Sequence, residues 1–235
     1  MERGGQTVPL TDFQRTLLAK LAERPGAPAG ESYLAGGAAL HFAPNSTRYS
    51  NDLDFFHDSV ERVATRVDWA HDSAWRFMPL VRDELGGLLL HPVDLAINKV
   101  LALAGRDEPR DFVDILFIHA RVLPLGAVCW AAAGKDPGFT PRSLLELLKR
   151  RGRYRPEEFA RLDLAEPFDL VAAKQAWLAA LESAEAFVRS RPPDEMGCLY
   201  WSVDALAFVM PAAGALASVQ PHFGVPGGVL PQVRT

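Results

Sequence analysis

Apolar residues recur at helical spacing over much of the chain. Near the start, Phe13, Leu17, Leu18 and Leu21 share one face of a helix predicted over residues 11–23. The same spacing predicts helices over residues 93–103, 111–120, 141–150, 157–162 and 169–188. Asp94 and Asp107 stand where helix starts favour acidic residues, and Pro109 fits a first helical turn. The pattern therefore predicts a largely helical second half.

Short apolar runs interrupted by glycines predict a small sheet earlier in the chain. Residues 32–35 form a strand candidate that stops at Gly36 and Gly37, and residues 38–42 then favour a helix. Residues 52–56 combine apolar and aromatic side chains, which indicates a buried strand. Further strand candidates at 75–81 and 88–90 surround a glycine pair and predict a hairpin or neighbouring strands.

These elements predict an α+β protein with three parts. Residues 1–92 are expected to form a mixed β-sheet core with flanking helices, and residues 93–200 a helical domain. Residues 201–235 are rich in Pro, Gly and Ala, so we expect an irregular C-terminal arm there.

The composition is that of an ordinary globular protein. Among 235 residues, 49% are hydrophobic and 23% charged, which allows one or two domains with a sizeable core. A net charge of -4 gives no general attraction to nucleic acid, although residues 149–155 form a local basic patch. Cys129 and Cys198 lie far apart without metal-ligand spacing, so we interpret them as reduced core thiols.

The first residues lack the pattern of a secretory signal. No basic start is followed by an apolar stretch and a small-residue cleavage site. No uninterrupted apolar run reaches the roughly 20 residues that a membrane-spanning helix needs. We therefore expect a cytoplasmic protein with no membrane partner.

Two carboxylates in one predicted strand are the first candidate for chemistry. A strand points Asp52 and Asp54 to the same face, with about 7 Å between them along the chain. Two like charges at one site need neutralising, and carboxylate oxygens suit a hard cation such as Mg²⁺ or Mn²⁺. Taken alone, the pair is more often a solvated strand edge.

A glycine pair upstream adds a phosphate-binding feature. Gly36 and Gly37 follow a strand, so they allow a ligand close to the backbone and to the amides of the next helix. Taken alone, they are also typical of a tight strand-to-helix turn. Together with Asp52 and Asp54 they favour a shared site for a metal ion and a nucleotide. Ser50, just before the acidic pair, either bonds a phosphate or caps the turn.

The segment YLAGGAALHFAPNSTRYSNDLDFF resembles the first two motifs of the AbiEii-like (AbiEii/AbiGii toxin) nucleotidyltransferases. The segment INKVLALAGRDEPRDFVDI resembles their later motif of a lysine and an arginine–aspartate pair. The stretch from Asp136 to about Val188, and RPPDEMGCLYW, are similar to the helical C-terminal part of bacterial members. The resemblance implies a nucleotidyltransferase-like core and a helical domain, with the site between them.

The resemblance also implies roles for individual residues. It implies metal binding by Asp52 and Asp54, phosphate contacts by Gly36 and Gly37, charge neutralisation by Lys99, and nucleotide or acceptor positioning by Asp111 or Asp114. We expect Asp52, Asp54, Lys99 and Asp111 to be the catalytic set, with Asp111 ranked ahead of Asp114.

The helix around Lys99 is apolar over much of its circumference, so we expect this lysine at a buried boundary with a partner. Arg106 falls seven positions later on nearly the same face, so both cations can face one anionic ligand, and we add Arg106 to the nucleotide-binding residues.

A structural ion pair between Arg110 and Asp114 explains their spacing about as well as catalysis. The histidines, including His41, show no paired ligand spacing and are assigned to packing or surface roles.

The predicted activity is metal-dependent transfer of a nucleoside monophosphate from an NTP to an acceptor, with release of pyrophosphate. The resemblance implies an RNA acceptor such as tRNA, a toxin–antitoxin or abortive-infection role, and a cognate antitoxin. Proteins of this fold usually have a third carboxylate on an adjacent strand, and here only Asp68, Asp72, Asp83 and Glu84 are available. A catalytically silent nucleotide-binding or interaction module therefore stays open. An antibiotic-modifying enzyme would need an acidic drug pocket, which no pattern places.

Overall fold

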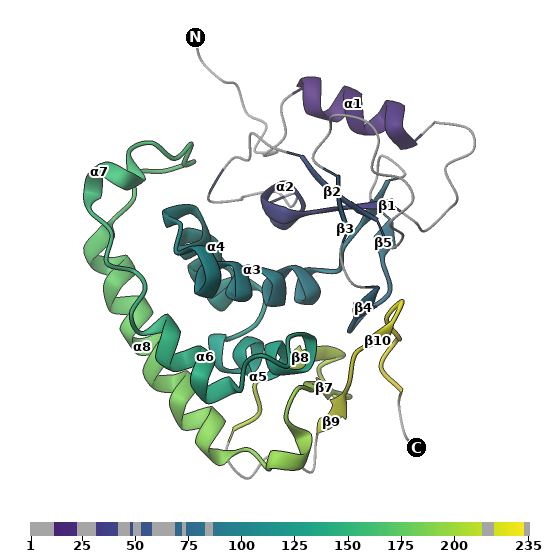
Figure 1. Cartoon of the computed structure of the whole chain (residues 1–235), viewed down its shortest axis with the longest axis vertical. Coiled ribbons are helices and arrows are strands. Elements are labelled where there is room, and N and C mark those ends of the chain that lie inside the picture. Colours follow the sequence, from purple (N-terminus) through teal and green to yellow (C-terminus); the bar gives the residue numbers. More distant parts are fainter. Residues whose placement is uncertain are drawn as a thin grey trace.

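The computed structural model describes residues 12–22, 32–41, 48, 53–57, 69–71, 74–82, 87–212 and 219–232. Its helices are α1 (Asp12–Ala22), α2 (Gly36–Leu40), α3 (Pro92–Arg106), α4 (Pro109–Arg121), α5 (Leu125–Lys135), α6 (Pro141–Leu148), α7 (Pro156–Phe159), α8 (Leu170–Ser190) and the 3-10 helix η2 (Pro193–Glu195). Its strands are β1 (Ser32–Ala35), β2 (Asp54–His57), β3 (Trp69–His71), β4 (Trp75–Arg76), β5 (Val81–Arg82), β6 (Leu88–Leu89), β7 (Leu199–Ser202), β8 (Ala207–Val209), β9 (Val219–His222) and β10 (Val225–Pro226). The chain is thus mixed α and β, as expected (Figure 1).

A five-stranded mixed sheet lies in the first part of the chain, in the order β3-β2-β1-β6-β5. The central strand β1 runs antiparallel to β2, with Ala35 opposite Asp54, and parallel to β6. Strands β5 and β6 are antiparallel neighbours, which confirms the pairing predicted around the glycine pair. Strand β3 runs parallel to β2 and was not predicted, because three residues are too short for a recognisable pattern.

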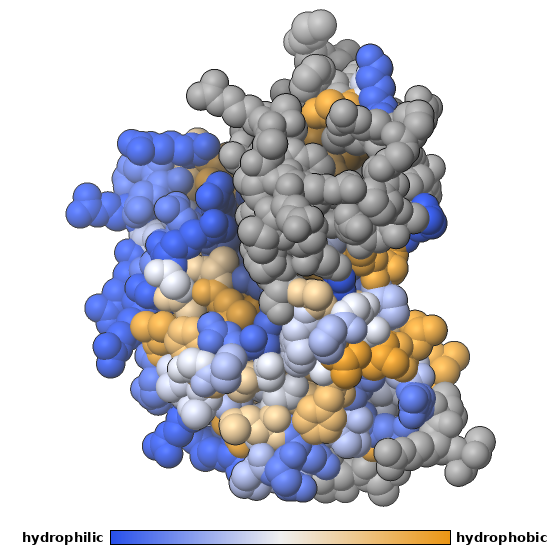
Figure 2. Space-filling view, turned by 45° about the vertical axis from the view of Figure 1, so that its right-hand side comes forward, coloured by the Kyte–Doolittle hydropathy of each residue, from blue (hydrophilic) through white to orange (hydrophobic). Residues whose placement is uncertain are grey.

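The helices that follow pack beside this sheet. Helix α5 contacts α3, α6 and α8, and α2 rests against α3. The long helix α8 and the short helix α7 lie along one flank of the molecule (Figure 1), and hydrophilic residues dominate that flank (Figure 2). The predicted helical character of residues 93–188 is therefore confirmed.

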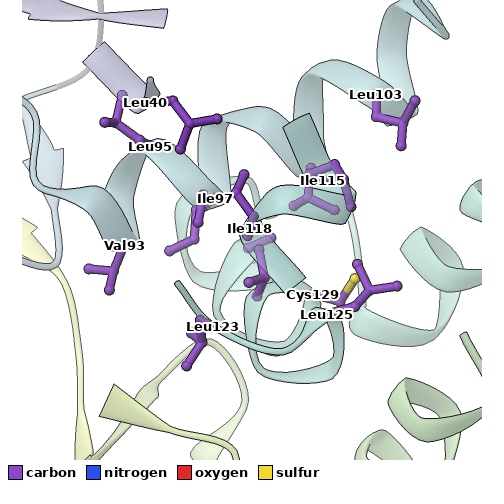
Figure 3. Close-up of a cluster of buried hydrophobic side chains, with 14 of the residues drawn as sticks. Leu40, Val93, Leu95, Ile97, Leu103, Ile115, Ile118, Leu123, Leu125 and Cys129 are labelled. Atoms are coloured by element: carbon purple, nitrogen blue, oxygen red, sulfur yellow. The ribbon is translucent and has the colours of Figure 1, made fainter. Parts of the chain in front are cut away.

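A single cluster of buried side chains joins the sheet to the helices. It includes Leu18 of α1, Leu34 of β1 and Leu199 of β7. Figure 3 shows part of it, with Leu40 of α2 beside Leu95 of α3. Because one core spans both regions, the sheet and the helices position each other.

Helix α5 was not predicted, since its sequence LGAVCWAAAGK is apolar on all sides and has no helical period. All residues from Leu125 to Ala132 are buried, as expected for a central helix. Within the described part of the chain, no individual helix has both the length and the apolar character for crossing a bilayer. In the described ranges, one pair of helices, α4 and α5, meets that requirement when taken together, and the pair is bent by 113°.

The expectation of Asp94 at a helix start is confirmed, because it lies in the first turn of α3, whereas the predicted helix start at Asp107 is wrong. Asp107 ends α3 as its C-cap, with a left-handed φ of 52°, and Glu108 precedes α4. Asp94 lies inside the first turn of α3, where its carboxylate accepts hydrogen bonds from the amides of Phe77 and Met78 at 2.8 and 3.0 Å. Pro109 does occupy the first turn of α4, as predicted.

The predicted single strand over 75–81 is also wrong. Strands β4 and β5 are separate, and β4 pairs with β10 in a sheet of its own. Between β4 and β5, the amides of Phe77 and Met78 donate to the Asp94 carboxylate, so these two amides are not available to a strand ladder.

The expected irregular arm over 201–235 is corrected as well. Strands β7, β8 and β9 form an antiparallel sheet in which Tyr200 faces Val209 on one side and Pro221 on the other. Strand β7 has four residues, three of them buried, which is too short for a recognisable period beside the Pro- and Gly-rich composition. Cys129 and Cys198 are both free and buried, which confirms their interpretation as core thiols.

Candidate functional site

The glycine turn and the acidic strand predicted as one site are adjacent in the structure. Gly36 begins α2 with a φ of +68°, a conformation that favours glycine. A Cβ atom at this position would collide with the carboxylate of Asp54, which starts β2 opposite Ala35. Glycine is therefore required at position 36 by both backbone conformation and the neighbouring acidic side chain.

Helix α2 carries the second glycine into the protein interior. Residues Gly37 to Leu40 are buried, and no side chain caps the start of this five-residue helix. The helix ends at His41, whose ring is fully buried. Phosphate contact by Gly36 and Gly37 stays a prediction.

Asp114 of α4 is the centre of a buried charge cluster. Its Oδ1 atom lies 2.7 Å from His41 Nε2 and accepts from Arg48 Nε at 3.0 Å. Its Oδ2 atom accepts from Arg48 at 3.1 Å and lies 2.7 Å from Lys99 Nζ. Burial raises the pKa of Asp114, but the charge of Lys99, the bond from His41 and the charge of Arg48 outweigh it, so the pKa lies well below its usual value.

Asp111, one turn earlier in α4, has its own cationic partners. Arg106 binds it with two hydrogen bonds, of 2.6 Å from Nε and 2.8 Å from a terminal nitrogen. Lys99 Nζ lies 3.5 Å from its Oδ1 atom. The bond to Asp111 raises the pKa of Arg106, to which the more distant charges of Glu108 and Asp54 also contribute. Lys99 thus links the two carboxylates, and Arg106 lies within electrostatic reach of Asp54.

Burial separates the members of this cluster into two groups. Asp111 and Asp114 have no exposed side-chain area, and the side chain of Lys99 is 7% exposed. The side chain of Arg106 is 48% exposed. Of these four, only Arg106 can meet a ligand without rearrangement.

The expected partner of Lys99 and Arg106 was one anionic ligand, and the structure supplies Asp111 in that place. Within the described residues, Asp114 pairs with His41, Arg48 and Lys99 and not with Arg110, so the alternative of an Arg110–Asp114 ion pair is not supported. Catalysis by Asp111 and nucleotide binding by Asp114, Lys99 and Arg106 stay predictions.

The expected metal ligands are described only in part. Asp54 starts β2, whereas Asp52 and Ser50 lie outside the described residues. Within the described ranges, no three His, Cys, Asp or Glu side chains gather as a metal site would require. Binding of Mg²⁺ or Mn²⁺ through Asp52 and Asp54 therefore stays a prediction.

His41 and Arg48 are cluster members that the sequence did not identify. Neither has a local pattern, and they meet Asp114 from 73 and 66 positions away in the chain. The signal that was available is indirect, since a carboxylate on the apolar face of a helix requires buried donors. The segment between the glycine turn and β2 contains both a histidine and an arginine.

No protein-family model matches the chain, and neither the curated proteins nor the solved structures give a match. The case for a function consequently depends on the residues and their geometry.

Proposed function

We propose that the protein is a metal-dependent nucleotidyltransferase that transfers a nucleoside monophosphate from an NTP to an acceptor hydroxyl. The observation that supports this most is the apposition of Gly36 and Asp54. It brings together two motifs that are separate in the sequence, at the end of β1 and the beginning of β2. A backbone without a side chain beside a carboxylate is what a phosphate group and its cation require.

Asp52 and Asp54 are the proposed metal ligands. Their oxygens suit Mg²⁺ or Mn²⁺, and a bound ion would polarise the α-phosphate and stabilise the charge of the leaving group. In the transfer, the acceptor oxygen forms a bond to the α-phosphorus and loses its proton. The bond from that phosphorus to the bridging oxygen breaks, and pyrophosphate leaves with the electron pair.

Arg106 is the side chain that we propose to contact the phosphates of the NTP. It is held by two bonds to Asp111, which fixes the guanidinium, and about half of its side chain is open to solvent. We propose that Lys99 does not contact the nucleotide directly. It neutralises Asp111 and Asp114 and so holds Arg106 and α2 in place. Asp111 and Asp114 are then positioning residues.

Strand β3 suggests where a third carboxylate can be sought. Its first residue, Trp69, pairs with Phe55 of β2 in a parallel register. In the sequence, Asp68 precedes Trp69 just as Asp54 precedes Phe55. We propose Asp68, among the available acidic residues, as the third member of the set.

The test is transfer of label from each α-labelled NTP to total bacterial RNA, with Mg²⁺ or Mn²⁺. We expect labelled RNA with the wild type, at least a hundredfold less with Asp54→Asn or Asp68→Asn, and no change with the exposed control Asp204→Asn. Absence of label with every NTP, or equal labelling by Asp54→Asn, overturns the proposal. If labelling is lost with Asp54→Asn but not with Asp68→Asn, the transferase proposal stands and only the assignment of Asp68 as the third carboxylate is overturned.

A catalytically silent nucleotide-binding module is the second candidate. It is favoured by the enclosure of Asp111 and Asp114, which the chain's own cations neutralise. Calorimetric titration with NTP and Mg²⁺ separates the two when it is read beside the transfer assay, because the silent module binds NTP and transfers no label.

For the proposed toxin role, induced expression of the wild type is expected to arrest bacterial growth, and Asp54→Asn to relieve the arrest. A cognate antitoxin is then a protein that restores growth when co-expressed.

A further inference from the structure

A basic segment connects α6 to α7. Residues 149–155 read KRRGRYR, with five cations and no acidic residue, in a chain whose net charge is -4. The side chains of Arg150, Arg153 and Arg155 are exposed. Lys149 differs from them, because it forms ion pairs with Glu146 and Glu185.

The backbone of the basic segment is anchored to the protein. The Tyr154 hydroxyl donates a 2.5 Å bond to Asp107 Oδ1, and Arg151 donates to Asp107 Oδ2 at 3.2 Å. Arg151 also binds the carbonyl of Ala104 at the end of α3. Tyr154 is buried against Phe112, with 5.5 Å between ring centroids. The segment is therefore a fixed structure, in contrast to a freely solvated run of charges.

Its residues divide into anchors and outward cations. Arg151, Gly152 and Tyr154 point into the protein or contact it, and Gly152 adopts a φ of +81° beside Phe112 and Trp177. Arg153 and Arg155 lie on the outer side, and neither forms an ion pair with any residue in the described ranges. The anchored backbone thus presents the guanidinium groups of Arg153 and Arg155 to solvent.

The basic segment and the chain that follows α7 each contact residues next to the candidate site. Its anchor Asp107 directly follows Arg106, the half-exposed cation of the site. Beyond α7, Leu164 pairs in a β-bridge with Arg48, whose side chain binds Asp114. In Figure 1 the chain between α6 and α7 runs along the side of the helical part.

We propose that the basic segment binds the phosphodiester backbone of a nucleic-acid strand and directs it toward the site. Arginine suits this partner because its planar guanidinium donates paired hydrogen bonds to phosphate oxygens. A row of arginines held in place offers repeated contacts to a repeating anion. An anionic membrane fits less well, because membrane-surface segments carry exposed apolar side chains and the aromatic residue here, Tyr154, is buried.

Binding of nucleic acid does not depend on the proposed transfer reaction. Only the assignment of that strand as the acceptor rests on the proposed function. The two claims therefore need separate measurements.

The binding test is fluorescence anisotropy of a labelled 30-nucleotide RNA, and of a DNA of equal sequence, without NTP and over a range of KCl concentrations. The variant Arg150→Gln/Arg153→Gln/Arg155→Gln is compared with the matched control Lys20→Gln/Arg121→Gln/Arg189→Gln, which removes the same charge from exposed positions elsewhere. Loss of three phosphate contacts is expected to weaken binding at least tenfold and to reduce the salt slope by about 2 to 3. The RNA and DNA arms decide which sugar is accepted.

Equal binding by the two triple variants and the wild type overturns the inference. Binding to phosphatidylserine vesicles that needs the three arginines, without binding of RNA or DNA, overturns it in favour of a membrane. Circular dichroism checks that the triple variant is folded, and Arg153→Glu gives a second, single-site measurement.

The transfer assay separates this inference from the proposed function. Asp54→Asn is expected to bind RNA like the wild type while transferring nothing. If RNA binding depends on the three arginines but neither the wild type nor any variant transfers label, the proposed function is overturned and the nucleic-acid-binding surface is supported. Transfer that is unchanged in the arginine variant overturns the acceptor role alone.

Discussion

The Nζ atom of Lys99 lies 2.7 Å from Oδ2 of Asp114, and the protein encloses both side chains almost completely. The lysine comes from α3 and the aspartate from α4, and the same carboxylate also holds the end of α2 through His41. This contact therefore fixes three helices around one charge pair.

Replacing Lys99 with Met leaves Asp114 and Asp111 with one fewer compensating charge. Removing one member of a buried pair costs about 3–5 kcal/mol, so we expect Lys99→Met to lower the free energy of unfolding by that amount. The matched control is Lys149→Met, which removes an ion-paired but exposed lysine and should change the midpoint of urea unfolding very little. Equal effects of the two substitutions would show that enclosure of Lys99 is unimportant.

Replacing Gly36 with Ala tests the apposition with Asp54. The new methyl group meets the carboxylate, and the left-handed backbone is unfavourable for alanine, so we expect a loss of about 1–3 kcal/mol and loss of nucleotide binding. Gly105→Ala is the control, because nothing lies within 4 Å of its added Cβ and alanine favours a helix. The control should be neutral or stabilising in denaturant unfolding.

The raised pKa of Asp94 predicts that the free energy of unfolding depends on pH. Burial raises its pKa to about 6, although the amides of Phe77 and Met78 and the charges of Lys135 and Arg76 oppose this. The folded protein therefore binds this proton more tightly than the unfolded chain, for which the pKa is 3.8. The resulting stabilisation is complete below pH 3.8 and is lost as the pH rises to about 6.

The variant Asp94→Asn cannot titrate and isolates this contribution. From pH 4 to pH 7, the wild type should lose on the order of 2–3 kcal/mol of unfolding free energy relative to the variant. Contributions from other carboxylates cancel in this difference, including Asp114, whose lowered pKa acts in the opposite direction. Unfolding by urea at several pH values measures the difference, and a flat curve would contradict the assignment.

Both thiols should be unreactive in the folded protein. Burial raises the pKa of Cys129 far above its usual value and that of Cys198 to about 12, and neither residue is exposed. Because the thiolate is the reactive form, Ellman's reagent at pH 8 should modify neither thiol before unfolding and both in guanidinium chloride. Rapid modification of either thiol in the native protein would show that local unfolding exposes that thiol to solvent.

Elements with a strong local pattern were predictable from the sequence. Strand β1, helices α3, α4 and α8, and the place of Pro109 follow from periodicity and capping. Helix α5 did not, because a helix that is apolar on all sides has no period to detect. The place of Asp94 in the first turn of α3 was predictable, whereas its contact with the Phe77 amide and the contact of Asp107 with Tyr154 leave no local pattern.

The site was predictable in the same uneven way. The meeting of Gly36 and Asp54 follows from motif order and strand pairing, and the structure places them in contact. The partners of Asp114 could not be deduced, because His41 and Arg48 contact it from 73 and 66 positions away in the sequence. Tertiary contacts of this kind leave no spacing in the sequence.

The pairing of β10 with β4 has a consequence for biosynthesis. Val225 lies opposite Arg76, and nearby Val229 and His222 both bond the carbonyl of Phe77. A ribosome adds about 5–20 residues per second, so β4 leaves the exit tunnel many seconds before its partner strand is made. During that interval the edge of β4 is uncovered, and a nascent chain stalled before residue 219 would expose it to chaperones or to other chains.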